Sequence, residues 1–552
     1  MKKLLLVLLL CAAVLPLNAD IFDDVENGDQ KAVANYIANG GDVNILKTDN
    51  WNAPLIVWAS KDWNRYHVNQ GKKEQHTYAP IVKMLIDAGA DVNAESSLRD
   101  TALLEASKGQ ETKDRIEIAK LLLKAGADQA KIKGQHPIYW ASYFNCPEIL
   151  KLLIAAGGEI DTKTNTRYPT MIAVLNGNTT VLEILAKNGA DLYKDDLFYS
   201  AVSFYLSDAR PGILSGIKTL IKLGVDVNVP REDGKTPLME LAKGGEEPDE
   251  EEKRLCGNDC RHAATPGSKE LEEITKIIWN AGASKSVNAV DENGWTALMY
   301  AIQNGNTEMV KFLLTKKANL NIVTKDGNSA LIFASENGNT EIVKTLLAAG
   351  AKVNTINKYG QTALMYASQN GHTDIVKVLL DSGANVNAMN TYGGTALMPA
   401  ADKGLTEIVK TLLNAGANVN AANKQGYTSL IVAAKNGHID TVKTLLAAKP
   451  DINAAEKTAG WNALIFASAM GYNDIVKLLI DAGANINAKT KQKDDALIMA
   501  SMLGKEDVVK TLIAAGANIN AKDEKGKSAL RWASEQGHDN IVKILLAAGA
   551  KK

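Results

Sequence analysis

Apolar and polar positions along the chain recur with a period of 33 residues. In one copy an apolar stripe follows Ser329, and Gly338 separates it from a second stripe at helical spacing that ends at Gly350. Glycine readily adopts the left-handed conformation that ends a helix, so each copy is predicted to form two short helices and a turn. The step is 33 residues throughout, except from Thr428 to Asn462, where it is 34. A fixed period of this size predicts a solenoid of stacked repeats.

Residues able to cap a helix stand at the start of each first helix. All carry an oxygen that can accept a hydrogen bond from a free amide, so we predict that each is an N-cap contributing about 1 kcal/mol. The eight positions are Thr296, Ser329, Thr362, Thr395, Thr428, Asn462, Asp495 and Ser528. Asparagines also recur near the repeat ends, and we interpret them as structural residues that bond to turn backbone in the neighbouring repeat. They are Asn354, Asn387, Asn420, Asn453, Asn487 and Asn520.

The residues of this period resemble the ankyrin-repeat family. Residues 296–301 (TALMYA) and 136–141 (HPIYWA) are similar to its T-P-L-H-x-A signature, and residues 415–420 (AGANVN) to its usual repeat ending. The resemblance covers nearly all of residues 20–552 and implies an all-α, elongated and curved solenoid of about fifteen helix-turn-helix repeats joined by hairpin-like turns. The chain departs from the family at the signature histidine. That position holds Met299, Ile332, Met365, Met398, Ile431, Ile465 and Ile498.

Residues 1–19 have the pattern of a secretory signal peptide. Lys2 and Lys3 precede an uninterrupted apolar run over residues 4–15, and the small residue Ala19 follows. The run is too short to cross a bilayer in the way a membrane helix does. We therefore expect an exported protein, periplasmic or secreted, without a membrane span.

The chain after this segment divides by regularity. Residues 20–44 are predicted to form a polar N-terminal capping repeat, residues 45–288 irregular ankyrin repeats with insertions, and residues 289–552 regular ankyrin repeats. Lipidation at Cys11 is an alternative to cleavage near residue 19. Leu10 disfavours it, because lipoprotein signals resemble one another in carrying a small residue there.

Four insertions interrupt the irregular repeats. All enter the connection between the two helices of a repeat, so we expect them to emerge along one edge of the rod. The first gathers Trp63, Tyr66 and His67, a composition suited to a contact surface with a partner. An ordinary loop folded back on the rod is an equal alternative.

The other long insertion, about residues 244–268, contains three groups with metal-binding chemistry. Cys256, Cys260 and His262 supply only three ligands, whereas a structural zinc site needs four. We therefore predict a local disulfide between Cys256 and Cys260 in an exported chain, with metal binding as the alternative.

Aromatic residues stand in the turns, where helix packing does not require them. In ankyrin proteins the turns resemble fingers whose tips grip a partner, so the resemblance implies that these residues are candidate binding positions. Packing of finger against finger is an equally strong interpretation. The residues are Trp295, Tyr359, Tyr392, Tyr427 and Trp461.

Charge and composition exclude some functions. The chain has 62 basic and 63 acidic residues; without Lys2 and Lys3 the basic count is 60, a formal charge of minus 3. This balance indicates no nucleic-acid partner. The seven histidines do not pair with a glycine-framed serine or a reactive cysteine, and the glycines are accounted for as helix ends. We therefore predict no catalytic, cofactor-binding or metal-binding residues.

The function favoured by these patterns is protein binding, as a recognition surface or a scaffold. We expect a monomer whose partners are one or more other proteins. Two alternatives stay open: a structural spacer of the cell envelope that binds nothing specific, and a metal-dependent activity in the insertion that carries Cys256.

The C-terminal end lacks an obvious polar cap. The last second helix keeps Ile541, Val542, Leu545 and Leu546 where interior repeats bury apolar side chains. We predict that this end frays, and that polar residues at Ile541 and Leu545 improve solubility.

Overall fold

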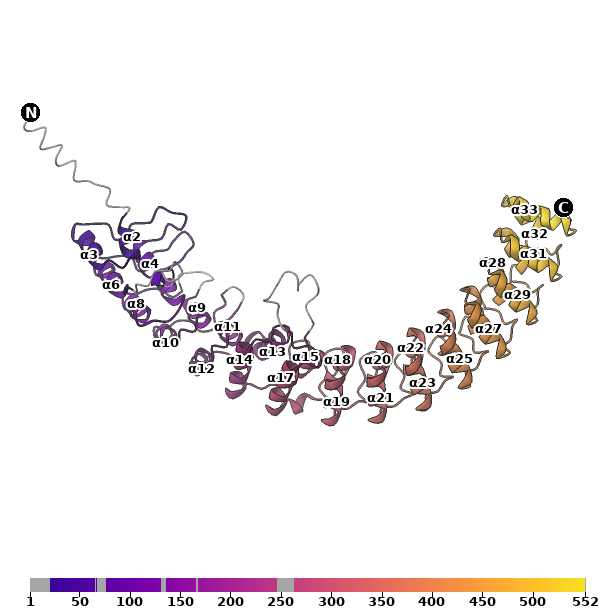
Figure 1. The fold of residues 1–552 in the computed structure, drawn as a ribbon, viewed down its shortest axis with the longest axis horizontal. Coiled ribbons are helices and arrows are strands. Elements are labelled where there is room, and N and C mark those ends of the chain that lie inside the picture. Colours follow the sequence, from indigo (N-terminus) through magenta and orange to yellow (C-terminus); the bar gives the residue numbers. More distant parts are fainter. Residues whose placement is uncertain are drawn as a thin grey trace, which may run out of the picture. The chain divides into compact units, whose positions relative to one another are not determined.

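The computed structural model describes residues 20–64, 66, 76–130, 136–164, 167–245 and 263–551. It forms two compact units, Met1–Ser286 (unit 1) and Val287–Lys552 (unit 2), each of which is described by itself (Figure 1). Within the described ranges the chain forms helices and turns, with isolated β-bridges at the base of some turns and no longer strand. The predicted all-α class is confirmed.

Unit 1 contains seven helix pairs among its described residues. The pairs are α2 (Asp20–Glu26) with α3 (Gln30–Ala38), α4 (Leu55–Ala59) with α6 (Ala79–Asp87), α7 (Ala102–Ser107) with α8 (Lys113–Lys124), α9 (Pro137–Tyr143) with α10 (Pro147–Ala155), α11 (Pro169–Asn176) with α12 (Thr179–Lys187), α13 (Leu197–Ser207) with α14 (Pro211–Lys222), and α15 (Pro237–Lys243) with α17 (Lys269–Asn280). Two short 3-10 helices, η1 (Lys194–Asp196) and η3 (Ala283–Ser286), precede α13 and follow α17.

Unit 2 contains eight pairs at the predicted period. They are α18 (Ala297–Gln303) with α19 (Thr307–Thr315), α20 (Ala330–Asn337) with α21 (Thr340–Ala348), α22 (Ala363–Asn370) with α23 (Thr373–Asp381), α24 (Leu397–Asp402) with α25 (Thr406–Asn414), α26 (Ser429–Lys435) with α27 (Ile439–Ala447), α28 (Ala463–Met470) with α29 (Asn473–Asp481), α30 (Ala496–Met502) with α31 (Glu506–Ala514), and α32 (Ala529–Glu535) with α33 (Asp539–Ala547). Fifteen pairs in the described chain agree with the predicted repeat number.

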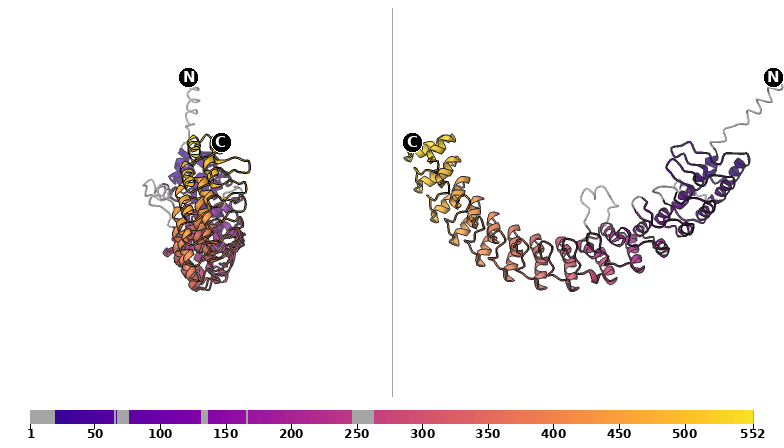
Figure 2. Two further views of the ribbon diagram at one scale, coloured as in Figure 1. Left: turned by 90° about the vertical axis from the view of Figure 1, so that its right-hand side faces the viewer. Right: turned by 180° about the vertical axis from the view of Figure 1, so that it is seen from behind.

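The helices of unit 2 lie in two rows. Consecutive first helices pack against one another, as α20 does against α22, and second helices such as α19 and α21 do the same. Within this unit the first helices lie on the inner side of the curve and the second helices on the outer side (Figures 1 and 2). The core between the rows is aliphatic: in α21 the side chains of Ile342, Val343 and Leu346 are fully buried. Each pair thus buries its faces against its neighbours, as expected of a solenoid.

The predicted N-caps are confirmed at seven of the eight positions. In each, the cap side chain accepts from the backbone N–H three residues on, at 2.9 to 3.4 Å. Thr395 is the exception, and its predicted cap is wrong. Pro399, which stands four residues later, has no N–H for the Thr395 carbonyl, and the Met398 N–H donates to that carbonyl at 3.3 Å instead. Helix α24 accordingly starts after Ala396, one residue later than it would if Thr395 were its N-cap.

The asparagine ladder is confirmed as structural. The Asn387 side chain accepts from the Asn418 N–H at 2.8 Å and donates to the Gly416 carbonyl at 3.1 Å, both in the next repeat. Asn354, Asn420, Asn453, Asn487 and Asn520 accept equivalent bonds at 2.7 to 2.9 Å. These contacts fix the spacing of successive repeats at their outer turns.

The C-terminal helix corrects one expectation. Ile541 and Leu545 of α33 are 2% and 0% exposed, because they face α32 of their own repeat. The partly open positions are Val542, which is half-buried, and Leu546, which is 39% exposed. In α21 the residue equivalent to Val542 is covered by the following repeat, and no repeat follows α33 among the described residues. Polar residues at Ile541 or Leu545 would therefore disrupt the core rather than improve solubility.

Candidate functional site

Each hairpin-like turn before a first helix of unit 2, here called a finger, has a fixed shape. In the finger before α22, the buried Asn357 side chain accepts from the backbone N–H groups of Tyr359 at 2.9 Å and Gln361 at 3.0 Å. Four other fingers are closed in this way by Asp291, Asn390, Glu456 and Asp523, and in a fifth Asn423 accepts from one turn amide, that of Tyr427. A side chain that satisfies two turn amides holds the turn in one conformation.

Neighbouring fingers are also bonded to one another. The Lys358 N–H donates to the Asp326 carbonyl, and the Thr391 N–H donates to the Tyr359 carbonyl, both at 2.9 Å. Equivalent bonds join the other fingers through the N–H groups of Lys325, Lys424, Lys457, Lys491 and Glu524. The fingers of unit 2 therefore form one continuous, hydrogen-bonded strip beside the first helices.

The predicted aromatic residues of the fingers fall into two groups. Trp295, Tyr427 and Trp461 directly precede a helix cap and are half-buried. The Trp295 ring lies 4.5 Å from the Phe333 ring of the next repeat, and the Trp461 ring lies 4.8 Å from that of Phe466. Packing of a finger against a helix accounts for these three residues, whereas the alternative interpretation was packing of finger against finger.

Tyr359 and Tyr392 lie at a different position, three residues before the cap position. Their side chains are 44% and 58% exposed, at the outer end of the finger. Of the five aromatic residues predicted as candidate binding positions in unit 2, these two have rings that are available to a partner.

The finger before α24 lacks a ring pair that two other repeats of unit 2 carry at the corresponding positions. The Trp295 and Tyr300 rings lie 5.3 Å apart in one repeat, and the Trp461 and Phe466 rings lie 4.8 Å apart in another, with both pairs tilted. Gly394 and Pro399 occupy the same two positions in the repeat of α24. The left-handed residue of this finger is Gly393 (φ 79°), so the turn does not require glycine at 394.

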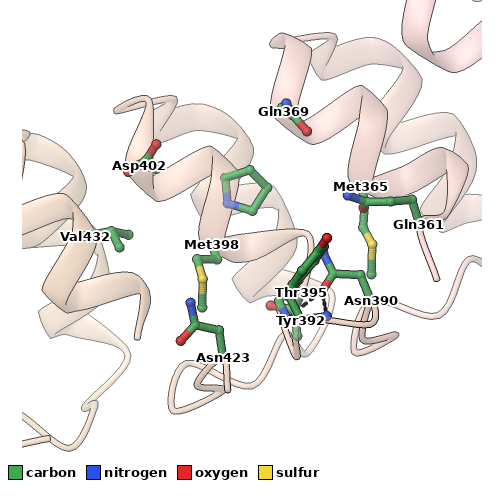
Figure 3. A pocket seen from close by; sticks show the side chains of 12 residues that line it. Gln361, Met365, Gln369, Asn390, Tyr392, Thr395, Met398, Asp402, Asn423 and Val432 are labelled. Atoms are coloured by element: carbon green, nitrogen blue, oxygen red, sulfur yellow. Dashed lines mark hydrogen bonds between the residues drawn. The ribbon is translucent and has the colours of Figure 1, made fainter. Parts of the chain in front are cut away.

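A cavity of about 340 Å³ lies beside Gly394 and Pro399, the positions that carry the ring pair in those two repeats. Its walls come from α22, α24, α26 and their fingers, and Figure 3 shows the side chains that line it. Met365, Met398, Pro399 and Val432 supply the apolar part. Met398 is half-buried, whereas the equivalent Met299 and Ile332 are 1% exposed. The apolar floor beside Gly394 and Pro399 is therefore partly open.

Polar groups surround this floor. The Asn390 oxygen accepts from the N–H groups of Tyr392 and Gly394, both at 2.9 Å, so its amide NH₂ remains to donate. The Asn423 oxygen accepts likewise from the Tyr427 N–H at 3.0 Å. Asp402, at the end of α24, is the one charged side chain among the lining residues that the structure describes.

Two of the three candidates in the first insertion lie among the described residues. Trp63 is 3% exposed; its ring lies 4.6 Å from that of Trp58, and its Nε1–H donates to the Trp58 carbonyl at 2.7 Å. It is a core residue, so its predicted place on a contact surface is wrong. Tyr66 is 46% exposed and contacts the Trp63 ring edge-on at 5.5 Å, while His67 lies outside the described residues.

A second cavity, of about 480 Å³, lies in unit 1 beside α13. The finger before α13 is shortened to η1, in which Asp195 and Asp196 both have a positive φ, near 50°. The Tyr199 hydroxyl donates to Glu240 at 2.5 Å, and burial raises the pKa of Tyr199 well above its usual range. The shortened finger thus opens a polar, acceptor-rich space.

The predicted cysteine pair cannot be placed, because Cys256 and Cys260 lie outside the described residues. Cys146 is a free, buried thiol whose Sγ–H donates to the Gly109 carbonyl at 3.3 Å. Burial raises its pKa to about 12. In the described ranges, no three His, Cys, Asp or Glu residues are grouped so that they could hold a metal ion. Nor does any described helix combine the length and apolar character that crossing a membrane requires.

Comparison with known proteins agrees with this architecture. A family model described as ankyrin repeats (3 copies) matches residues 73–164, 112–196, 261–357, 350–423, 397–490 and 464–552, which is more than half of the chain. The chain belongs to the ankyrin-repeat family.

Three curated relatives illustrate how this ankyrin-repeat protein compares with others. It is 35% identical over 245 residues to the ankyrin repeat and KH domain-containing protein mask-1 of Caenorhabditis elegans, covering 44% of this chain and 8% of the relative. It is 29% identical to the human transient receptor potential cation channel subfamily A member 1, covering 40% of this chain and 21% of the relative. It is also 29% identical to the mouse ankyrin repeat and SOCS box protein 6, covering 29% of this chain and 38% of the relative. The matches thus span well under half of each relative's length.

The most distinctive surface of this ankyrin-repeat protein was not predicted from its sequence. The cavity beside Tyr392 depends on residues that are small or cyclic, whereas the sequence pattern that predicts binding positions is one of aromatic side chains. A usable signal was present, since Pro399 interrupts a column of aromatic and bulky aliphatic residues, and Gly394 is the one residue without a side chain in its own column.

Proposed function

We propose that this is an exported ankyrin-repeat protein that binds other proteins through the fingers and first helices of unit 2, without catalysing a reaction itself. The observation that carries the proposal is the exposed Tyr392 ring beside an apolar cavity on this face. Exposed aromatic rings next to apolar pockets are typical of residues that dominate binding energy.

The arrangement of the fingers supports binding by a preformed surface. The bonds within and between fingers hold this face in one shape, so little conformational entropy is lost when a partner docks. The helix surface on the opposite side is different in character. There, Lys443 pairs with Asp440 at 3.4 Å and both side chains are well exposed, as expected of a solvated face.

Site-specific photocrosslinking tests the binding face. A photoreactive amino acid replaces Tyr392 in the full-length protein, expressed in its own cells, and a matched variant carries it at Lys443 on the outer face. We expect discrete crosslinked products from position 392 and none from position 443. Equal products from both positions, or none from either, would refute binding through this face.

Export is a separate part of the proposal. It is supported by the basic pair, apolar run and small residue within residues 1–19. N-terminal sequencing of the protein recovered outside the cytoplasm should begin close to Asp20; recovery in the cytoplasm with Met1 intact would contradict it. We further expect a monomer without affinity for nucleic acid, which sedimentation with and without added DNA and RNA tests.

A further inference from the structure

Resting on the proposed function, the geometry points to a partner segment in the polyproline II conformation that inserts one long apolar side chain, flanked by a basic residue, into the cavity at Gly394 and Pro399. The inference has three parts: what the cavity holds, how the backbone is held, and where charge is recognised. Each follows from a different group of residues.

The cavity calls for an apolar side chain. The cavity of about 340 Å³ lies beside the two positions where two other repeats carry a ring pair, such as Trp295 and Tyr300. Met398 is only half-buried, and apolar surface left in contact with water costs hydrophobic free energy. A methionine or leucine side chain from a partner would cover this floor, and the flexible thioether of Met398 can adapt to either.

The spacing of the amides selects the conformation of the backbone. Asn390 and Asn423 offer NH₂ groups one repeat apart, which for packed helices is about 8–10 Å. A polyproline II chain rises about 3.1 Å per residue with three residues per turn, so carbonyls i and i+3 point the same way about 9 Å apart. In a β-strand, carbonyls three residues apart point to opposite sides, so a strand does not match this spacing.

The exposed Tyr392 ring agrees with this conformation. Aromatic side chains at the mouth of a groove are a recurrent means of holding proline-rich segments, whose backbone is already extended and loses little entropy on binding. Tyr392 is 58% exposed and lines the cavity. Its neighbour Tyr359 is exposed to a similar extent but does not line the cavity, which makes it a matched control.

Charge is recognised at the end of α24. Asp402 is exposed and carries the one charge among the described lining residues. One of its carboxylate oxygens accepts from Asn436 at 2.9 Å, which positions the group without neutralising it. A lysine or arginine beside the apolar residue of the partner would complement this charge.

The test uses a display library of twelve-residue peptides with proline fixed at every third position and all other positions random. Selection is carried out on the full chain from residue 20, and a fully random library is selected in parallel. Selected peptides are then measured by fluorescence anisotropy against Gly394→Tyr, Tyr392→Ala and Tyr359→Ala. Tyrosine already stands at the position of residue 394 in the repeat of Tyr427, and a Cβ at 394 makes only ordinary contacts, so Gly394→Tyr fills the cavity without backbone strain.

We expect the proline library to yield peptides with methionine or leucine next to lysine or arginine. Their affinity should fall at least tenfold for Gly394→Tyr and Tyr392→Ala, and change less than twofold for Tyr359→Ala. Three results would overturn the inference: no enrichment, equal binding to Gly394→Tyr, or preferred peptides from the random library that lack proline. Crosslinking from position 392 that persists in Gly394→Tyr would leave the proposed function standing and remove only this inference.

Discussion

Replacement of Thr362 and Thr395 by alanine should have different costs, although the two residues hold the same place in adjacent repeats. Both side chains are about 5% exposed or less, so the packing lost is similar. The Thr362 hydroxyl accepts from the Met365 N–H at 3.2 Å, whereas Thr395 caps nothing because Pro399 has redirected the Met398 N–H to a carbonyl. A lost N-cap costs about 1 kcal/mol. We therefore expect Thr362→Ala to destabilise its repeat by about 1 kcal/mol more than Thr395→Ala destabilises its own.

Native-state hydrogen exchange of peptides that cover α22 and α24 measures this difference locally, which matters because long repeat arrays need not unfold in two states. A difference of about 1 kcal/mol corresponds to roughly fivefold faster exchange in α22. Restoring the missing N–H with Pro399→Tyr should raise the cost of Thr395→Ala toward that of Thr362→Ala, as a double-mutant cycle would show. The role given to Pro399 would be refuted if the two alanine replacements cost the same stability, or if the cost of Thr395→Ala were the same with proline and with tyrosine at residue 399.

Three further outcomes are expected. Lys449→Gly should stabilise the protein by about 0.5–1 kcal/mol, because Lys449 has φ 52° at a position where other repeats place glycine. Urea unfolding measures the change, and a loss of stability would contradict this expectation. Cys146, with its pKa near 12, should not react with a thiol reagent at pH 8 until the chain unfolds. As the pH rises, the thiol of the unfolded chain loses its proton before the buried thiol does, so the contribution of Cys146 to stability should decline from about pH 9 toward pH 12. Rapid modification of the native protein would refute the burial. Leu546→Lys should lower aggregation measured by light scattering with little loss of stability, whereas Ile541→Lys should destabilise the last repeat by several kcal/mol; the reverse order would show that the open face is misassigned.

The repeat architecture could be predicted from the sequence because its determinants are local. A cap such as Thr362 acts on a backbone amide three residues away, and Gly338 ends its own helix through a left-handed φ. Such interactions need no knowledge of the rest of the fold, so a pattern of residue types is sufficient. The one failed cap was also local, since Pro399 lies four residues beyond Thr395, but the column of capping residues by itself gives no sign of it.

The surface was decided by the tertiary structure. Whether an aromatic residue in a finger is covered or open depends on its offset from the cap and on residues in the next repeat: Trp295 is covered by Phe333, and Tyr392 remains open beside Gly394. In the first insertion, Trp63 looked suited to a partner, but it lies against Trp58 in the core. At the chain end, four apolar residues of α33 look alike in sequence, and only the direction each faces separates buried Ile541 from open Leu546. Burial depends on which neighbour occupies the adjacent space, and that neighbour is set by the packing of whole repeats rather than by the residue itself.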